Sequence, residues 1–93
     1  MLLKVISFDS DNPNWESDLM WNLSFLHSVE QHINDILHVR GYIYLNQICE
    51  MLNVEWDTDE ENLCVKFDKK TRVEFETFDE PNSSFIVHIK CHN

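Results

Sequence analysis

The sequence is poor in basic residues, in glycine and in long apolar runs. It has 7 Lys and Arg against 17 Asp and Glu, a formal net charge of -10, and a surface of that sign repels the phosphates of nucleic acid. The single glycine excludes a glycine-rich phosphate loop. No apolar run approaches the ~20 residues of a membrane span, and the first four residues lack the basic start of a secretory signal. We therefore expect a cytoplasmic protein that binds neither membranes nor nucleic acid directly.

The apolar content is high enough for a folded core. Hydrophobic residues make up 43% of the 93 residues and aromatic residues 12%, far from the composition of a disordered chain. This length suits one hydrophobic core, so we expect a single compact domain over residues 1–93. The three cysteines are odd in number and widely spaced, which favours reduced thiols over a disulfide framework.

The first part of the chain shows two sequence periods. Leu2 to Phe8 has the alternation of a strand, and residues 9–17, rich in Asp, Asn and Ser, are typical of a loop. Asp18 to Arg40 has the period of a helix, which Ser17 or Asp18 caps at its start and Gly41 at its end. The apolar stripe of this helix comprises Leu19, Leu23, Leu26, Ile33 and Leu37, widened by Phe25, Val29 and Ile36. Glu30 lies at its edge, where we expect a much smaller contribution to stability.

The segment after Gly41 predicts a short second helix. Tyr42 to Tyr44 favours an extended link, and Asn46 is a plausible helix cap. Three apolar residues then share one face, and Asn53 suits the left-handed exit conformation that glycine usually takes. That face consists of Leu45, Ile48 and Leu52.

Three alternating runs follow, separated by two polar turns at residues 68–71 and 79–84. They predict an antiparallel meander, and the fold is predicted to be α+β: one long and one short helix packed on a three- or four-stranded antiparallel sheet, with the first strand at an edge. Lys66 or Lys90 is expected to pair with Glu74 or Glu76 across the outer face. The runs are Leu63/Val65/Phe67, Val73/Phe75/Thr77 and Phe85/Val87/Ile89.

No catalytic, cofactor or metal motif stands out. His27, His32 and His38 are five and six residues apart, whereas two imidazoles on a helix need a spacing of four to reach one ion. The acidic run after Trp56 resembles the start of a calcium loop, but Asn62 stands where the sharp turn requires glycine. We therefore predict no enzyme activity, no cofactor and no metal site.

Acidic and aromatic residues give the candidate site. Five of the seven residues from Glu55 to Glu61 are acidic, around Trp56. Trp21 falls opposite the leucine stripe, so it is either covered by the loop that carries Trp15 or exposed for a partner. If exposed, it would join Met20 and the acidic turn in one surface suited to Arg-rich proteins, since carboxylates and indoles both bind guanidinium groups. The predicted partner-binding residues are Glu55, Trp56, Asp57, Asp59, Glu60, Glu61 and Trp21.

The Gly-Tyr-Ile-Tyr-Leu-Asn segment from Gly41, which ends in Leu52-Asn53-Val54, resembles small uncharacterised acidic proteins of phages and prophages. In these a short helix begins at Leu-Asn and ends in Leu-Gly. Asn53 replaces that glycine here, and Leu63-Cys64 replaces the Gly-Trp that often opens the next strand. The resemblance implies a small protein of a mobile element, without a known enzymatic role, that acts by contact.

The leading hypothesis is an acidic protein-interaction module, most simply an inhibitor of a basic nucleic-acid-binding or defence protein of the host. By analogy with anti-CRISPR and anti-restriction inhibitors, it would act through charge that imitates DNA. The alternative is a structural or assembly protein of a phage or prophage, associating with further copies of itself. An inhibitor should gather its acids on one face, whereas an assembly protein should spread them and leave an apolar patch.

Overall fold

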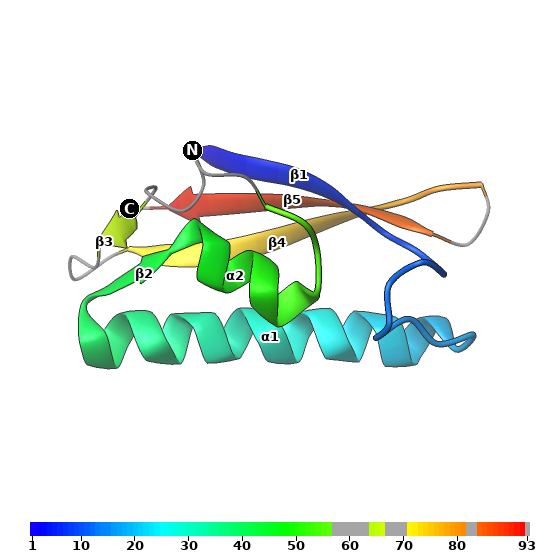
Figure 1. Cartoon of the computed structure of the whole chain (residues 1–93), viewed down its shortest axis with the longest axis horizontal. Coiled ribbons are helices and arrows are strands. Elements are labelled where there is room, and N and C mark those ends of the chain that lie inside the picture. The colour runs from blue at the N-terminus through cyan, green and yellow to red at the C-terminus, as the bar shows by residue number, and fades with distance from the viewer. Residues whose placement is uncertain (57–63, 67–70, 82–83, 93) are drawn as a thin grey trace.

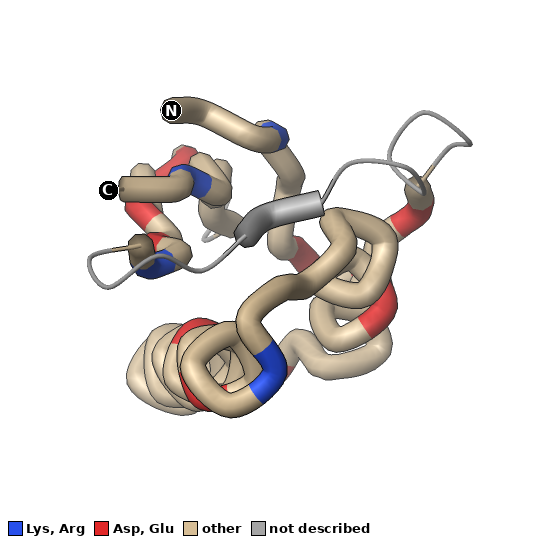
Figure 2. Tube along the Cα trace, turned by 90° about the vertical axis from the view of Figure 1, so that its left-hand side faces the viewer, with Lys and Arg blue, Asp and Glu red and all other residues tan. Residues whose placement is uncertain are grey.

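The computed structural model describes residues 1–56, 64–66, 71–81 and 84–92. A three-stranded antiparallel sheet has the strand order β1-β5-β4, and β2 and β3 form a separate two-stranded pair. Both helices lie on one side of the larger sheet, as the end-on view also shows (Figures 1 and 2). The predicted α+β fold is therefore confirmed. The elements are β1 (Leu2–Phe8), α1 (Leu19–Arg40), β2 (Tyr42–Tyr44), α2 (Leu45–Leu52), β3 (Cys64–Lys66), β4 (Arg72–Asp79) and β5 (Phe85–His92).

Both predicted ends of α1 are confirmed. The Asp18 carboxylate accepts a hydrogen bond of 2.9 Å from the Met20 N–H, which satisfies one free donor of the first turn. Gly41 ends the helix at φ 86°, a left-handed conformation that side chains disfavour, and its N–H donates to the Leu37 carbonyl at 2.8 Å.

The apolar stripe of α1 is buried only along part of its length. Leu26, Ile33 and Leu37 are buried against the sheet as predicted, together with Val29. Leu19 and Leu23, at the start of the stripe, are 45% and 38% exposed, so the prediction that they are core residues is wrong. The strands β4 and β5 diverge from α1 toward this end of the molecule, which leaves the first turns of the helix less covered (Figure 1).

The segment after Gly41 is a strand followed by a helix. Tyr42–Tyr44 is extended, as predicted, and forms β2, which pairs with β3 in an antiparallel register. Helix α2 begins at Leu45, and Asn46 lies inside it instead of capping it. The Gln47 side chain performs the capping, because its Oε1 accepts a hydrogen bond of 3.0 Å from the Tyr44 N–H. Asn53 has φ 56° and ψ 43°, which confirms the predicted left-handed exit.

The predicted three-stranded meander is also wrong. Only β4 and β5 form a hairpin, whereas β3 pairs with β2 and β1 pairs with β5. The first strand therefore lies at an edge, as expected. Alternation identifies a strand but does not select its partner, and β2 at the end of α1 supplies a nearer partner for β3. Leu63 and Phe67, the ends of the first predicted run, lie outside the described residues.

Aromatic rings attach the loop between β1 and α1 to the core. The Trp15 ring lies 5.5 Å from the Phe8 ring and 6.1 Å from the Phe85 ring, between centroids, and Phe8 stacks on Phe25 at 5.7 Å. The buried Asn12 side chain donates to the Leu52 carbonyl at 2.7 Å, which ties the same loop to the end of α2. The loop is therefore held from two sides.

Replacing the buried Ile33 by alanine should lower the free energy of unfolding by about 2 to 5 kcal/mol, because the substitution leaves a cavity in the core. Val39→Ala on the same helix, where the side chain is 86% exposed, should change it by less than ~0.5 kcal/mol. Urea unfolding of both variants measures the difference. Equal losses would contradict the orientation of α1.

Candidate functional site

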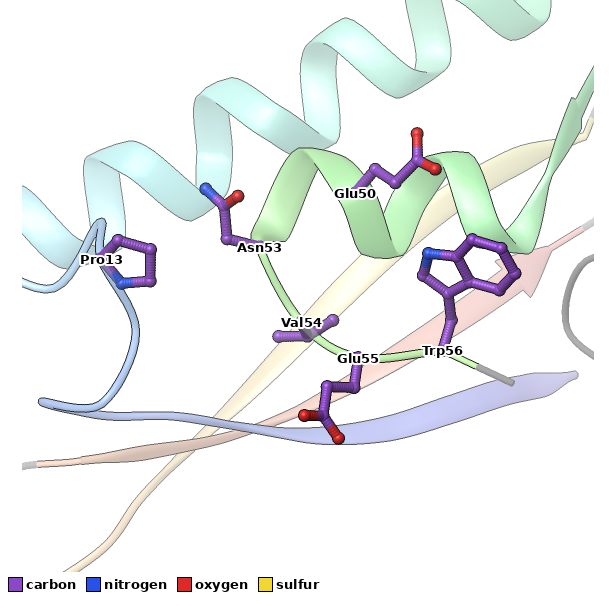
Figure 3. Close-up of a pocket in the computed structure, with 6 residues that line it drawn as sticks. All are labelled: Pro13, Glu50, Asn53, Val54, Glu55 and Trp56. Carbon is purple, nitrogen blue, oxygen red and sulfur yellow. The ribbon is translucent and has the colours of Figure 1, made fainter. Parts of the chain in front are cut away.

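The predicted site residues Glu55 and Trp56 follow α2 along the chain. The Val54 N–H donates to the Cys49 carbonyl at 3.0 Å, and Lys4 Nζ donates to the Glu55 carbonyl at 2.9 Å. These bonds hold the segment between α2 and β1, where it borders an open cavity of about 620 Å³ (Figure 3). The cavity is lined by Pro13, Glu50, Asn53, Val54, Glu55 and Trp56.

The Trp56 cavity combines an indole with two carboxylates. The Trp56 ring lies beside α2 and is 36% exposed, while Glu50 extends from α2 and Glu55 from the segment over β1 (Figure 3). An exposed indole face and carboxylates are groups that bind guanidinium or ammonium ions. The other four predicted acids, Asp57, Asp59, Glu60 and Glu61, lie outside the described residues.

Trp21 does not belong to this cavity. It lies in the first turn of α1 and is 53% exposed, so the second of the two alternatives, exposure, holds. Trp15, which the loop itself carries, is the indole that packs against the core. The first turn of α1 lies at one end of the molecule, whereas residues 53–56 pass over its middle (Figure 1). Trp21 therefore lies apart from Glu55 and Trp56, the described part of the acidic turn that was expected to join it.

A second acidic surface forms where three segments meet. The loop at residues 9–18, the first turns of α1 and the turn between β4 and β5 lie at the same end of the molecule (Figure 1). This acidic end has no Lys or Arg in its described residues, and no ion pair among them involves its carboxylates. Its acids are Asp9, Asp11, Glu16, Asp18, Asp79 and Glu80, and its exposed apolar side chains are Leu19, Met20, Trp21, Leu23 and Phe78.

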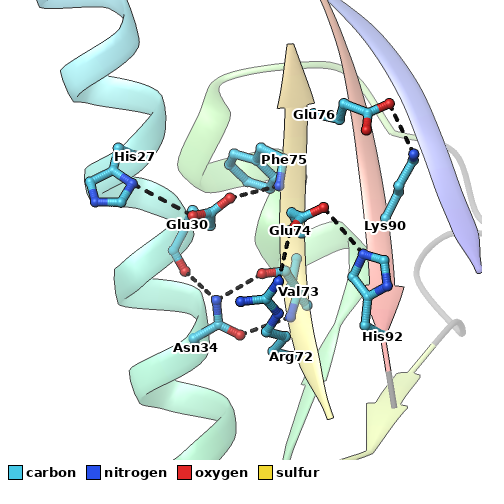
Figure 4. Close-up of polar contacts among 10 residues, drawn as sticks. All are labelled: His27, Glu30, Asn34, Arg72, Val73, Glu74, Phe75, Glu76, Lys90 and His92. Atoms are coloured by element: carbon cyan, nitrogen blue, oxygen red, sulfur yellow. Dashed lines mark hydrogen bonds and ion pairs between the residues drawn. The ribbon is translucent and has the colours of Figure 1, made fainter.

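The Lys and Arg positions coloured blue in Figure 2 lie toward the opposite end, which faces the viewer there. There they are engaged within the chain. Lys90 Nζ lies 3.0 Å from Glu76 Oε1, which confirms the predicted pairing across strands, and Arg72 pairs with Glu74 at 2.8 Å (Figure 4). Arg40 donates to Gln47 at 2.8 Å. Among the described side chains, these contacts leave little cationic charge to neutralise the acidic end.

Two side chains of α1 close part of the free edge of β4. Asn34 Nδ2 donates to the Val73 carbonyl and Asn34 Oδ1 accepts from the Val73 N–H, each at 2.8 Å (Figure 4). Two residues along the strand, the Phe75 N–H donates to Glu30 Oε2 at 2.7 Å. The helix therefore replaces the missing neighbouring strand at these positions. Glu30 has a specific structural role that its place at the stripe's edge did not indicate.

Comparison with known proteins adds no identity, because no family model, curated protein or solved structure matches the chain. Within the described ranges, no group of three or more His, Cys, Asp or Glu side chains is placed to hold a metal ion. No helix among the described residues is long and apolar enough to cross a membrane.

Asn34→Ala should lower the free energy of unfolding by about 1 to 3 kcal/mol, because it removes both partners of the Val73 backbone groups. Gln31→Ala, at an exposed position of the same helix, should stay within ~0.5 kcal/mol of wild type. Denaturant unfolding measures both. Hydrogen exchange should also speed up at the Val73 amide, and an unchanged rate there would contradict the edge contact.

Proposed function

We propose that the protein is an acidic interaction module that binds a basic protein. The observation that carries this proposal is the acidic end, where six carboxylates are in no ion pair within the described residues and adjoin exposed apolar side chains. Clustered charge of one sign attracts an oppositely charged surface over a Debye length, and nearby apolar side chains add short-range contact once the two surfaces meet.

The partner class that fits best is a nucleic-acid-binding or defence protein of the host. Such proteins have basic grooves that bind phosphates, and a compact domain with a formal net charge of -10 competes for the same grooves. The resemblance of residues 41–54 to small phage and prophage proteins supports a partner in the host of a mobile element. The protein would then be an inhibitor that imitates the charge of DNA, in the manner of anti-CRISPR and anti-restriction proteins.

A phage structural or assembly protein is the second candidate, and one observation favours it. Exposed apolar side chains such as Met20 and Trp21 adjoin one another in the first turn of α1, as expected of a surface buried between copies. The clustering of acids at the same end favours the inhibitor, because identical acidic surfaces repel each other.

Neutralising the acidic turn tests the surface predicted from the sequence. If this turn docks the partner, replacing Asp57, Asp59, Glu60 and Glu61 together by Asn or Gln should abolish binding and leave the melting temperature unchanged or higher, since like charges no longer repel. If the acidic end alone docks the partner, binding should persist. Binding is measured by capture from a host lysate and stability by thermal unfolding. Loss of folding without a selective loss of binding would show that the turn is structural.

Salt and DNA test the mechanism. Affinity for the captured partner should fall steeply with salt, and duplex DNA should compete for the partner although the protein alone binds no DNA. Trp21→Ala and Trp56→Ala should weaken binding mainly through faster dissociation, because short-range contacts govern residence time. Val39→Ala serves as the control, because Val39 is exposed at the opposite end of α1 from Trp21 and does not line the Trp56 cavity. Salt-independent affinity without DNA competition would favour the assembly protein.

A further inference from the structure

The free edge of β4 is closed along only half its length. Its register with β5 has no irregularity, so the backbone groups of alternate residues point away from β5 in turn. Val73 and Phe75 are in this set because their N–H groups bond to Asn34 and Glu30. The same alternation places the N–H and carbonyl groups of Thr77 on the outer edge. Within the described part of the chain, α1 bonds to this edge at Val73 and Phe75 and not at Thr77.

The reason lies in the side chains of α1. Four residues of helix advance about 6 Å and two residues of antiparallel strand about 6.8 Å, so Asn34 and Glu30 keep step with Val73 and Phe75. One turn further toward the helix start, the position in step with Thr77 is Leu26, which is buried. The next position, Asn22, is buried and bonds to the Glu16 backbone instead of the strand, and Leu23 and Leu19 beside it are partly exposed. Leucine side chains have no polar atom for the strand. The edge is therefore left open where α1 becomes apolar.

A groove lies between this open edge and the helix. One cavity of about 270 Å³ brings Leu23 and His27 of α1 together with Phe75 and Thr77 of β4. A second, of about 180 Å³, brings Leu19 together with Asp79, Glu80 and Phe85 at the hairpin turn. A helix beside an open strand edge is the arrangement that receives an extended peptide as an added strand. The peptide backbone bonds to the edge, and alternate side chains enter the groove.

The charge around the groove specifies the occupant. Asp79 and Glu80 form its outer end, Asp18 and Glu16 lie on the neighbouring segment, and the described residues of this end include no Lys or Arg. A second copy of the chain would bring the same carboxylates into opposition, which disfavours pairing of two β4 edges. A segment with Lys or Arg at alternate positions would instead place cations against them.

We propose that the edge of β4 from Thr77 to Asp79 is a strand-addition site for an extended segment of a basic protein, whose apolar side chains enter the groove beside Leu19 and Leu23. This inference rests on the proposed function for the basic character of the partner. It adds the mode of recognition, which is pairing of backbones and not imitation of DNA by charge alone. The segment would become the fourth strand of the sheet, next to β4.

The test uses a short synthetic peptide of alternating Val and Lys, with nuclear magnetic resonance as the readout. Adding it to the full chain should shift the Thr77 amide signal and slow its hydrogen exchange, with weaker effects at Leu23. N-methylation of alternate peptide nitrogens should weaken binding by about tenfold, because hydrogen bonds to the edge are lost. A peptide of alternating Val and Glu should not bind. Peptide-induced shifts confined to the Trp56 cavity would overturn the proposal.

Two protein variants sharpen this test. Thr77→Pro removes an N–H that faces away from β5, so the fold should persist while peptide binding is lost. Leu23→Ser, which retains every backbone group, should weaken binding, whereas Val39→Ser, an exposed apolar position at the other end of α1 that lines neither cavity, should not. If Thr77→Pro fails to fold, the Leu23 and Val39 pair decides. Equal binding by both, or dimerisation of the wild type through β4, would overturn the proposal.

The outcomes separate this inference from the proposed function. If a partner from the lysate binds with salt-sensitive affinity, and Leu23→Ser leaves that affinity unchanged, strand addition is refuted and the acidic interaction module stands. Binding of the Val-Lys peptide at Thr77, combined with a partner affinity that does not depend on salt, would refute recognition by charge. It would leave the strand-addition site standing.

Discussion

The contact of Asn34 and Glu30 with the edge of β4 is the constraint on which the rest of the structure depends. Three hydrogen bonds of 2.7 to 2.8 Å join helix side chains to strand backbone, and they fix how far α1 lies along the sheet. That position buries Ile33 and Leu37 of α1. It also determines which turns of the helix extend beyond the closed edge, and these are the turns that carry Leu23, Trp21 and Leu19.

The directions of the strands and helices then determine where acidic and basic residues lie in the molecule. Strands β1 and β4 run toward the end where α1 and β5 begin, so the segments that connect them gather there (Figure 1). Residues 5–39 and 73–89 contain no Lys or Arg, and their acids in the connecting segments accumulate at this end. Asp18 and Glu16, close to the start of α1, are also stabilised there by the positive end of the helix dipole. At the other end, Arg72 and Lys90 are held by Glu74 and Glu76.

Local signals in the sequence predicted local structure well. Asp18, Gly41 and Asn53 were each identified as helix termini from conformational preferences that act within a few residues. The predicted partner of β3 was wrong, because strand pairing depends on where the end of α1 positions β2. An alternating sequence pattern carries no information about that position. For the same reason Trp21 and Trp56, grouped by composition, lie on separate surfaces. Two stretches free of Lys and Arg were readable in the sequence, but only the topology brings their acids together.

Open strand edges promote aggregation, and proteins commonly protect them with charge or by covering them. This chain uses both devices on one strand. Amide and carboxylate groups of α1 cover β4 at Val73 and Phe75, and carboxylates surround the part left open from Thr77 to Asp79. The two devices differ in one respect. Covering side chains exclude every added strand, whereas negative charge repels copies of the same chain and attracts a basic strand. The acidity that would oppose pairing of this edge with itself is thus also the property that would select its partner.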